Sequence, residues 1–184
     1  PLNWLIMLCP KGYVIEFMTY MIVFKSGLAG LSMAWYLKKH TGSQKFGACY
    51  FGVFYALSGY MAAYSWNIMW LDCILLFPVI MLGLEQLVKE GKGLLYGISL
   101  GVCILSNYYI SIMICMFMVI YFFALWILER GRSGRDFVVS GFKFAGYSVL
   151  AGGLSAAVLL PEIFALQMTA SGDVNFPKTV TSYF

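Results

Sequence analysis

The 184-residue chain is 61% hydrophobic and only 11% charged, and its mean hydropathy is +0.82. A soluble domain carries about a quarter charged residues, so this chain has too little charge for the surface of a water-soluble globule. The net charge of +4 is modest and lies mostly in the predicted loops, which excludes a nucleic-acid-binding protein and favours membrane orientation.

Hydrophobic runs predict six membrane-spanning helices in chain order. They cover residues 13–37, 46–65, 71–87, 94–108, 109–128 and 144–166. A bilayer core about 30 Å thick requires about 20 apolar residues per helix, so we expect the short third and fourth spans to be shielded by their neighbours. The predicted fold class is an all-α, polytopic transmembrane helix bundle of one domain. Because the chain begins at Pro1 rather than Met, we interpret residues 1–184 as part of a larger membrane domain.

The distribution of basic residues predicts the orientation of these spans. Lys and Arg follow the first, third and fifth spans, at positions 38, 39, 45, 89, 92, 130, 132, 135 and 143. The alternate connections, at Trp66–Trp70 and around Asn107, contain neither residue type. By the positive-inside rule, the basic loops face the cytoplasm and the other two face outward. The sequence therefore predicts a multi-pass protein of the cell membrane.

Small residues at four-residue spacing indicate close helix packing. One such series is Gly93, Gly97 and Gly101, and another starts at Ser148 and Gly152 and continues to Ala156. In lipid, faces of this kind allow van der Waals contact between helices.

The cysteines and the single histidine do not predict a metal site. The five cysteines are scattered and mostly lie inside apolar runs, and His40 is the only histidine. A structural zinc site needs four clustered ligands, so we interpret the cysteines as small buried hydrophobic residues. No cofactor is indicated, although a divalent cation is compatible with the sequence.

The connection at residues 64–72 is the first candidate site. Trp66 and Trp70 offer flat apolar faces, Asn67 can donate and accept hydrogen bonds, and Asp72 supplies a carboxylate at the membrane boundary. These groups suit a sugar or a lipid headgroup. The alternative is an interfacial aromatic belt, with Asp72 at the start of a helix.

Further polar residues are expected on the same side. Asn107 and Tyr108 lie in a tight turn that either contributes to the site or is closed by its own side chains. Glu162 follows Pro161 near the outer end of the last span and either points into the same cavity or is solvated. Glu85 and Glu90, near the cytoplasmic end of the third span, are predicted to be solvated.

Lys25 lies near the middle of the first span, where a lysine costs about 2.5–3.5 kcal/mol on insertion. Such a residue usually faces the bundle interior and pairs with an anion. A phosphate group or a carboxylate from another span would fit, and snorkelling to the interface is the alternative.

Specific motifs resemble those of the bacterial YfhO membrane-protein family. They are YALSGY at 55–60, SWNIMWLD at 65–72, SNYYI at 106–110, PLN at 1–3 and KSGLAGL at 25–31. The resemblance covers nearly the whole chain.

This resemblance implies a glycosyltransferase of the GT-C architecture. Such enzymes transfer a sugar from a polyprenyl-phosphate carrier to an acceptor outside the membrane, here a cell-envelope polymer such as teichoic acid. The implied partners are therefore membrane lipid, the carrier-linked sugar and the envelope polymer. The catalytic acidic residue is expected in the first large outer loop after the first span of the family fold. Both would precede residue 1, so residues 1–184 alone should be inactive.

The resemblance also suggests roles for the candidate residues. Lys25 would hold the carrier phosphate, while Trp66, Asn67, Trp70 and Asp72 would line the donor or acceptor side. Asn107, Tyr108 and Glu162 would lie opposite them.

Two other classes of function fit the composition. A transporter or flippase for a lipid-linked or amphipathic substrate would also use Lys25 and short spans. In a non-catalytic membrane scaffold, the tryptophans would be belt residues and Lys25 would have a structural partner.

Overall fold

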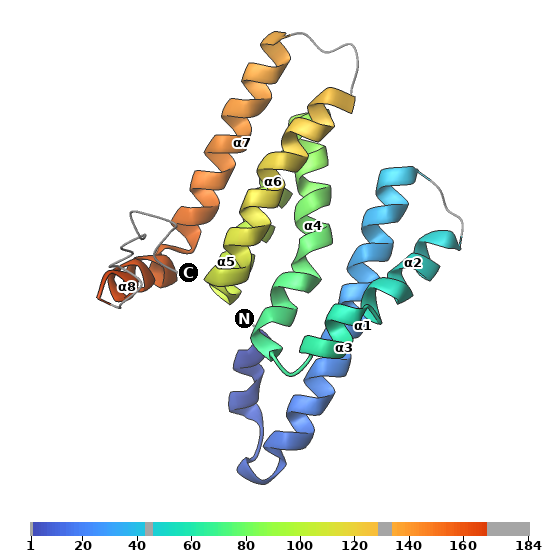
Figure 1. Cartoon of the computed structure of the whole chain (residues 1–184), viewed down its shortest axis with the longest axis vertical. Helices are drawn as coiled ribbons and strands as arrows, with labels where there is room; N and C mark the ends of the chain where they lie inside the picture. The colour runs from blue at the N-terminus through green and yellow to red at the C-terminus, as the bar shows by residue number, and fades with distance from the viewer. Residues whose placement is uncertain (1, 43–45, 129–133, 169–184) are drawn as a thin grey trace, which may run out of the picture.

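The computed structural model describes residues 2–42, 46–128 and 134–168, and within these ranges every regular element is a helix. Two 3₁₀ helices come first, and eight α-helices follow (Figure 1). Their bounds are η1 Leu2–Leu8, η2 Lys11–Tyr13, α1 Val14–Thr41, α2 Gly47–Ala56, α3 Gly59–Tyr64, α4 Ile68–Glu90, α5 Leu94–Ser106, α6 Tyr108–Leu128, α7 Gly134–Leu154 and α8 Ala156–Gln167. The all-α membrane bundle predicted from composition is confirmed.

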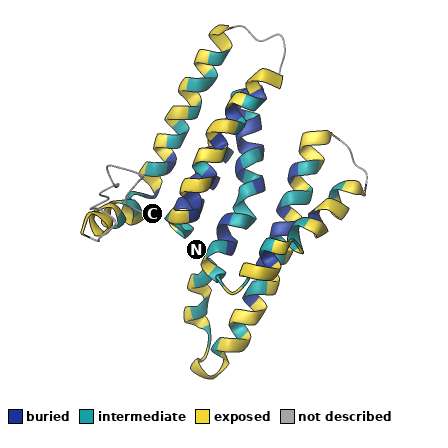
Figure 2. Ribbon diagram, in the orientation of Figure 1, coloured by how far each residue is buried: buried dark blue, intermediate teal, exposed yellow. Residues whose placement is uncertain are grey.

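Helix α4 is the central element of the bundle. It packs against α1 on one side and against α5, α6 and α7 on the other. Burial is concentrated on α4 and α5, whereas α1, α2, α7 and α8 expose much of their surface (Figure 2). Many of these exposed side chains are large and hydrophobic, as expected where lipid is the solvent.

The two ends of α4 define the two ends of the bundle. We call the end at which α4 begins, beside Trp66, the Trp66 end, and the end at which α4 finishes, beside Lys92, the Lys92 end. In Figure 1 the Trp66 end lies below and the Lys92 end above. Glycine terminates a helix twice at the Lys92 end: Gly42 follows α1 at φ +64° and Gly91 follows α4 at φ +74°. Glycine adopts this left-handed conformation without the steric cost of a Cβ atom.

Among the described residues, four helices are long and apolar enough to cross a membrane. They are Lys11–Thr41, Ile68–Glu90, Tyr108–Leu128 and Gly134–Leu154. Helix α5 has only 13 residues and is shielded, as expected for the fourth span, because Tyr96, Gly97 and Leu100 are buried. The third predicted span is longer than expected, since α4 begins at Ile68 and continues to Glu90.

The second predicted span is not one helix. It is divided into α2 and α3 by a break at Leu57–Ser58, where Ser58 is extended at ψ 157°. Ser58 and Gly59 are both weak helix formers, and serine is favoured ahead of a helix start. The hydropathy of this stretch did not reveal the break.

The sixth predicted span is also displaced. Helix α7 begins at Gly134, ten residues before the predicted start, and the chain bends at Ser155 before α8. The charged residues Arg135 and Lys143, predicted to lie in a loop, belong to the first half of α7. Lys143 donates to the carbonyl of Gly91 at 3.3 Å, which ties α7 to the end of α4.

The first small-residue series packs as predicted. A Cβ atom on Gly93 would overlap the ring of Tyr147, and one on Gly97 would lie 3.2 Å from it. Helices α5 and α7 can approach so closely because these side chains are absent. In the second series, by contrast, a Cβ on Gly152 would meet nothing within 4 Å.

Candidate functional site at the Trp66 end

A buried ion pair joins α1 to α4 at the Trp66 end. Lys25 Nζ lies 2.7 Å from Asp72 Oδ1, and the two side chains are 0% and 2% exposed. Asp72 lies in the second turn of α4, because the helix begins at Ile68 and not at residue 71. The alternative in which Asp72 starts the helix is therefore wrong, and the carboxylate pairs with Lys25. A carboxylate near a helix N-terminus is also favoured by the helix dipole.

The ammonium of Lys25 has three oxygen acceptors. Besides Asp72, it donates to Asn3 Oδ1 at 2.6 Å and to the carbonyl oxygen of Ile68 at 3.0 Å. These three contacts use the full donor capacity of an ammonium group. Lys25 is therefore satisfied inside the protein.

The same cluster holds the N-terminal segment in place. The backbone N–H of Leu2 donates to Asp72 Oδ2 at 3.2 Å, while Asn3 accepts from Lys25. Helix η1, which starts at Leu2, is thus attached to both α1 and α4. Two charged side chains from two spanning helices fix the position of a segment that has little other contact with the bundle.

A cavity of about 240 Å³ lies against this cluster, and we call it the Trp66 pocket. Its lining residues come from η1, the first half of α1, the turn before α4 and the first turn of α4: Asn3, Ile6, Phe17, Met18, Met21, Trp66, Asn67, Ile68 and Met69. Lys25 donates to two of them, Asn3 and Ile68. The ion pair therefore supports one wall of the pocket from behind.

The polar groups of the pocket are two amides beside an indole. Trp66 is 69% exposed, and its Nε1 donates to the carbonyl of Ala63 at 3.0 Å, which fixes the ring orientation. Asn67 occupies the N-cap position of α4, yet its side chain makes no capping hydrogen bond. The carboxamide of Asn67 can therefore serve a ligand. The side-chain oxygen of Asn3 accepts a hydrogen bond from Lys25. The side-chain NH₂ group of Asn3 can therefore donate to other partners.

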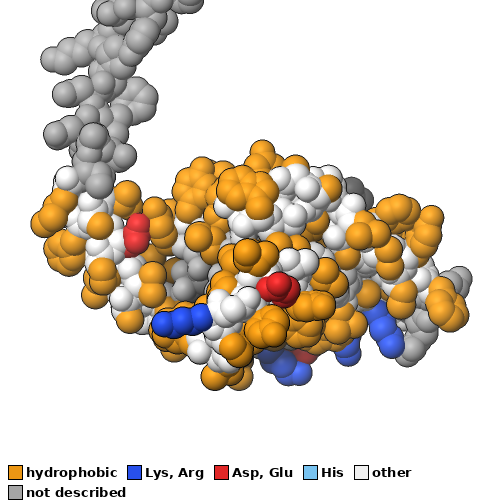
Figure 3. Space-filling view, turned by 90° about the horizontal axis from the view of Figure 1, so that it is seen from below, with side chains coloured by type: hydrophobic (Ala, Val, Ile, Leu, Met, Phe, Trp, Pro, Cys, Tyr) orange, Lys and Arg blue, Asp and Glu red, His pale blue; other side chains and the backbone are white. Residues whose placement is uncertain are grey.

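Trp70 lies outside this pocket, in a row of aromatic rings. Its ring centroid is 6.1 Å from that of Tyr64 and 6.5 Å from that of Tyr109, and Tyr64 in turn lies 5.2 Å from Tyr60. The row connects α3, α4 and α6. Seen from the Trp66 end, hydrophobic side chains cover most of the surface, and charged side chains are few and separate (Figure 3).

The remaining candidates have local partners. Asn107 Oδ1 accepts from the backbone N–H of Ile110 at 3.0 Å, so this residue caps α6. Tyr108 and Glu162 lie close enough to interact electrostatically, so α6 faces α8 at this point. Of the eight predicted site residues, only Trp66 and Asn67 line the Trp66 pocket, with Lys25 and Asp72 behind it.

Comparison with protein-family models gives a match to the family described as bacterial membrane protein YfhO, over residues 1–183. The chain belongs to this family. No curated protein and no solved structure matches the chain. The family name records a bacterial membrane protein and states no reaction.

A second polar cluster of this YfhO-family chain lies near the Lys92 end, where the sequence predicted a solvated Glu85. That prediction is wrong, because Glu85 is only 3% exposed. Its Oε1 accepts from Tyr121 at 2.6 Å and from Tyr36 at 2.9 Å, and His40 Nδ1 lies 2.7 Å away. Lys89 Nζ lies 3.3 Å from Oε2. The carboxylate thus joins α1, α4 and α6.

Glu90, the neighbouring acidic residue, is exposed as predicted and pairs with Lys92 at 2.8 Å. This hydrogen bond raises the pKa of Lys92, which lies outside the spans, above its ordinary value.

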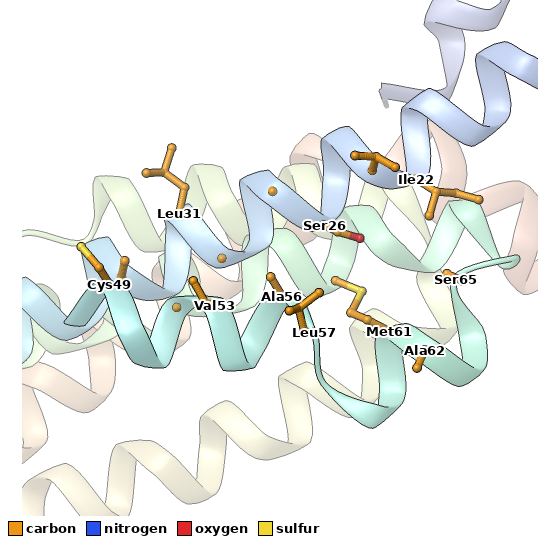
Figure 4. A pocket seen from close by; sticks show the side chains of 15 residues that line it. Ile22, Ser26, Leu31, Cys49, Val53, Ala56, Leu57, Met61, Ala62 and Ser65 are labelled. Atoms are coloured by element: carbon orange, nitrogen blue, oxygen red, sulfur yellow. The ribbon is translucent and has the colours of Figure 1, made fainter. Parts of the chain in front are cut away.

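A larger groove, at another place in the bundle, contains none of the predicted site residues. It measures about 760 Å³, lies between α1 and the α2–α3 pair, and is lined almost wholly by apolar side chains (Figure 4). Small residues form much of its floor, and a Cβ on Gly52 would come within 2.6 Å of the Gly30 carbonyl oxygen.

No cluster of three or more His, Cys, Asp or Glu side chains suited to a metal occurs in the part of the chain that the structure describes.

Proposed function

We propose that this YfhO-family chain is part of an integral membrane glycosyltransferase of the GT-C type. The enzyme would move a sugar from a polyprenyl-phosphate carrier to a cell-envelope polymer, such as teichoic acid, on the outer side of the membrane. The observation that carries the proposal is the Trp66 pocket, in which an exposed indole and two amides meet at one end of the bundle.

The chemistry of the pocket suits a sugar. The C–H face of a pyranose stacks on an indole ring, and carboxamides can donate to and accept from its hydroxyl groups. The apolar remainder, from η1 and α1, would exclude water from the sugar, as in other small-ligand sites. Trp66 and Asn67 are the residues that we assign to substrate.

The role proposed for Lys25 follows from its burial. An ammonium that already serves three oxygens, with no exposed surface, is poorly placed to bind a carrier phosphate. We assign Lys25 and Asp72 to positioning: together they hold Asn3 and Ile68 in the pocket wall. The acidic residue that would deprotonate the acceptor hydroxyl would come from the outer loop that the family resemblance implies.

The test uses membranes that contain the full-length protein. Radiolabelled polyprenyl-phosphate sugars are supplied, and incorporation into envelope polymer is compared for the wild type, Asn67→Ala and Trp66→Ala. Trp35→Ala, at an exposed tryptophan near the other end of α1, is the matched control. We expect the two pocket variants to lose at least about tenfold in transfer, since each removes a contact worth about 1.4 kcal/mol or more, while the control keeps wild-type activity.

Three outcomes would contradict the proposal. Equal loss in all three variants would show that the assay reports folding rather than the pocket. Absence of transfer from any of several carrier-linked sugars, by folded and abundant protein, would favour a transporter or flippase for a lipid-linked substrate. Wild-type activity in both pocket variants would remove Trp66 and Asn67 from the site.

A further inference from the structure

Two cavities between α1 and the α2–α3 pair join into one groove. The first is the groove of about 760 Å³ described above, which follows α1 from Ile22 to Ala34 (Figure 4). The second measures about 330 Å³ and lies farther toward the Lys92 end, with Lys38 and Phe46 in its lining. We call the two cavities together the Lys38 groove. They are continuous because they share three lining residues, Leu31, Ala34 and Cys49.

Lys38 is the charged side chain of this groove among the lining residues that the structure describes. It is exposed, and it forms no ion pair with a carboxylate of the described residues. Lys89 and Lys92, at the same end of the bundle, each pair with a glutamate. The ammonium of Lys38 is therefore accessible and available to an anion that enters the groove.

The rest of the lining is almost wholly apolar and open to the surroundings. Leu31 and Phe46 are both exposed, and they belong to helices that flank the groove on either side. Helix α1 is long and apolar enough to cross a membrane, and lipid chains are the solvent for apolar side chains of such a helix. A concave apolar surface that ends at an accessible cation fits an amphiphile with an anionic head and a hydrocarbon tail.

The dimensions of the groove fit a lipid of one leaflet. Lys38 lies in the last turn of α1 together with Lys39 and His40, and basic side chains at the end of a spanning helix reach the headgroup region. From Lys38 back to Gly27, α1 extends about 16 Å at about 1.5 Å per residue. An acyl chain spans half of a bilayer core, which is about 15 Å. One chain therefore fits along this part of α1 while its headgroup lies beside Lys38.

We propose that the Lys38 groove binds an anionic phospholipid from the leaflet at the Lys92 end. The Lys38 ammonium pairs with the headgroup phosphate, and one acyl chain lies along α1 from Ala34 toward Gly27. A zwitterionic headgroup carries its own cation, which competes with Lys38 for the phosphate, so the site favours a headgroup with net negative charge. The groove shares no lining residue with the Trp66 pocket, so this proposal does not depend on sugar transfer.

The test compares anionic and zwitterionic lipids on the delipidated full-length protein in detergent. The protein is titrated with phosphatidylglycerol and with phosphatidylcholine of the same acyl chains, and bound lipid is counted by native mass spectrometry. We expect the wild type to bind phosphatidylglycerol about fivefold more tightly, which corresponds to about 1 kcal/mol for one lysine near a charged surface. Lys38→Gln should abolish most of this preference. Lys39→Gln is the matched control and should keep it, because Lys39 does not line the groove.

Cys49→Phe tests the apolar part of the groove. Cys49 is exposed and lines both cavities, so a phenyl ring at this position would occupy the space of the acyl chain. We expect the affinity for both lipids to fall by about fourfold or more, since the loss of one buried methylene group changes the free energy by about 0.8 kcal/mol. Melting curves in lipid-free detergent separate lost binding from lost folding. Lys38→Gln, at an exposed side chain, keeps the test decisive if Cys49→Phe does not fold.

Four results would overturn the proposal. Equal affinity of the wild type for the two lipids would remove the role of charge. Equal loss of the preference in Lys38→Gln and Lys39→Gln would attribute it to the general surface charge of this end. Wild-type affinity of folded Cys49→Phe would place the lipid outside the groove. A protein dimer that excludes lipid and disappears in Cys49→Phe would assign the groove to a second copy of the chain.

Discussion

The Lys25–Asp72 ion pair connects three parts of the molecule: η1, α1 and α4. Removing two charges from water is costly, and the pair is favourable only when every donor and acceptor is used. Here the ammonium reaches a carboxylate, an amide and a backbone carbonyl, and the carboxylate also accepts from Leu2. Loss of either partner would leave an uncompensated charge in the membrane interior.

We therefore predict that Lys25→Met and Asp72→Leu each lower the free energy of unfolding by about 3–5 kcal/mol. The double variant should recover most of this loss, because apolar residues then replace the whole pair. Unfolding in mixed detergent micelles measures all three, with Lys38→Met, at an exposed lysine of the same helix, as the control. A double variant as unstable as the sum of the single variants would show that the pair is not the source of the loss.

Glu85 gives a second prediction at this scale. Glu85→Leu should cost at least about 2 kcal/mol, because Oε1 accepts hydrogen bonds from Tyr36 and Tyr121 and charge-assisted bonds are worth about 1.5–3 kcal/mol. Glu85→Gln should cost less, since an acceptor oxygen remains. Glu90→Gln is the control on the same helix and should change stability little, because Glu90 is solvated. Wild-type stability of Glu85→Leu would contradict a structural role for the cluster.

The sequence predicted some of these residues better than others. Trp66 and Asn67 were identifiable because their polar and aromatic groups interrupt an apolar region. A carboxylate from another span was one of the partners expected for Lys25, although its identity depends on how α1 packs on α4. The burial of Glu85 was missed. A pattern that could have indicated it is the i, i+4 pair Tyr36 and His40, which places two hydrogen-bonding groups on one face of α1.

At the scale of elements, hydropathy predicted helices well where the apolar run was continuous. Helix α6 matches the expected 109–128 almost residue for residue. The method failed where the chain changes direction inside an apolar run, as at Leu57–Ser58 and at Ser155, because hydropathy reports solvent preference and not backbone geometry. It also ended the third span too early, because a helix can continue past the apolar core into the interface.

The close packing of α4 against α5 gives a prediction for these elements. A Cβ on Gly83 would lie 2.5 Å from the backbone nitrogen of Tyr96 and 2.7 Å from its Cα. Backbone atoms cannot turn aside as a side chain can, so Gly83→Ala should force the helices apart and cost about 1–3 kcal/mol.

Gly152→Ala in α7 is the matched control for that substitution, since its Cβ would meet nothing within 4 Å. Alanine is the better helix former, so this variant should be as stable as the wild type or more stable by up to about 1 kcal/mol. Melting temperatures of Gly83→Ala and Gly152→Ala in detergent test whether the close α4–α5 contact excludes a Cβ atom at Gly83. Similar behaviour of the two would show that the α4–α5 contact is looser than the structure indicates.

At the scale of the whole molecule, the bundle has two chemically different ends. The Lys92 end carries Lys38, Lys39, Lys89 and Lys92, which belong to or directly follow α1 and α4. The Trp66 end presents aromatic and amide groups, with Lys11 ahead of α1 as a basic residue there. The predicted orientation rests on this asymmetry, and the proposed outward position of the Trp66 pocket depends on that orientation.

Cysteine accessibility in intact cells tests that orientation. In full-length protein whose native cysteines are replaced, Trp66→Cys and Lys92→Cys each place one thiol at an exposed position, since the native side chains are 69% and 75% exposed. A membrane-impermeant maleimide should label Trp66→Cys in intact cells, and Lys92→Cys only after permeabilisation. If only Lys92→Cys were labelled in intact cells, the bundle would have the opposite orientation to the predicted one. The Trp66 pocket would then face the cytoplasm, where a glycosyltransferase acting on envelope polymer could not use it.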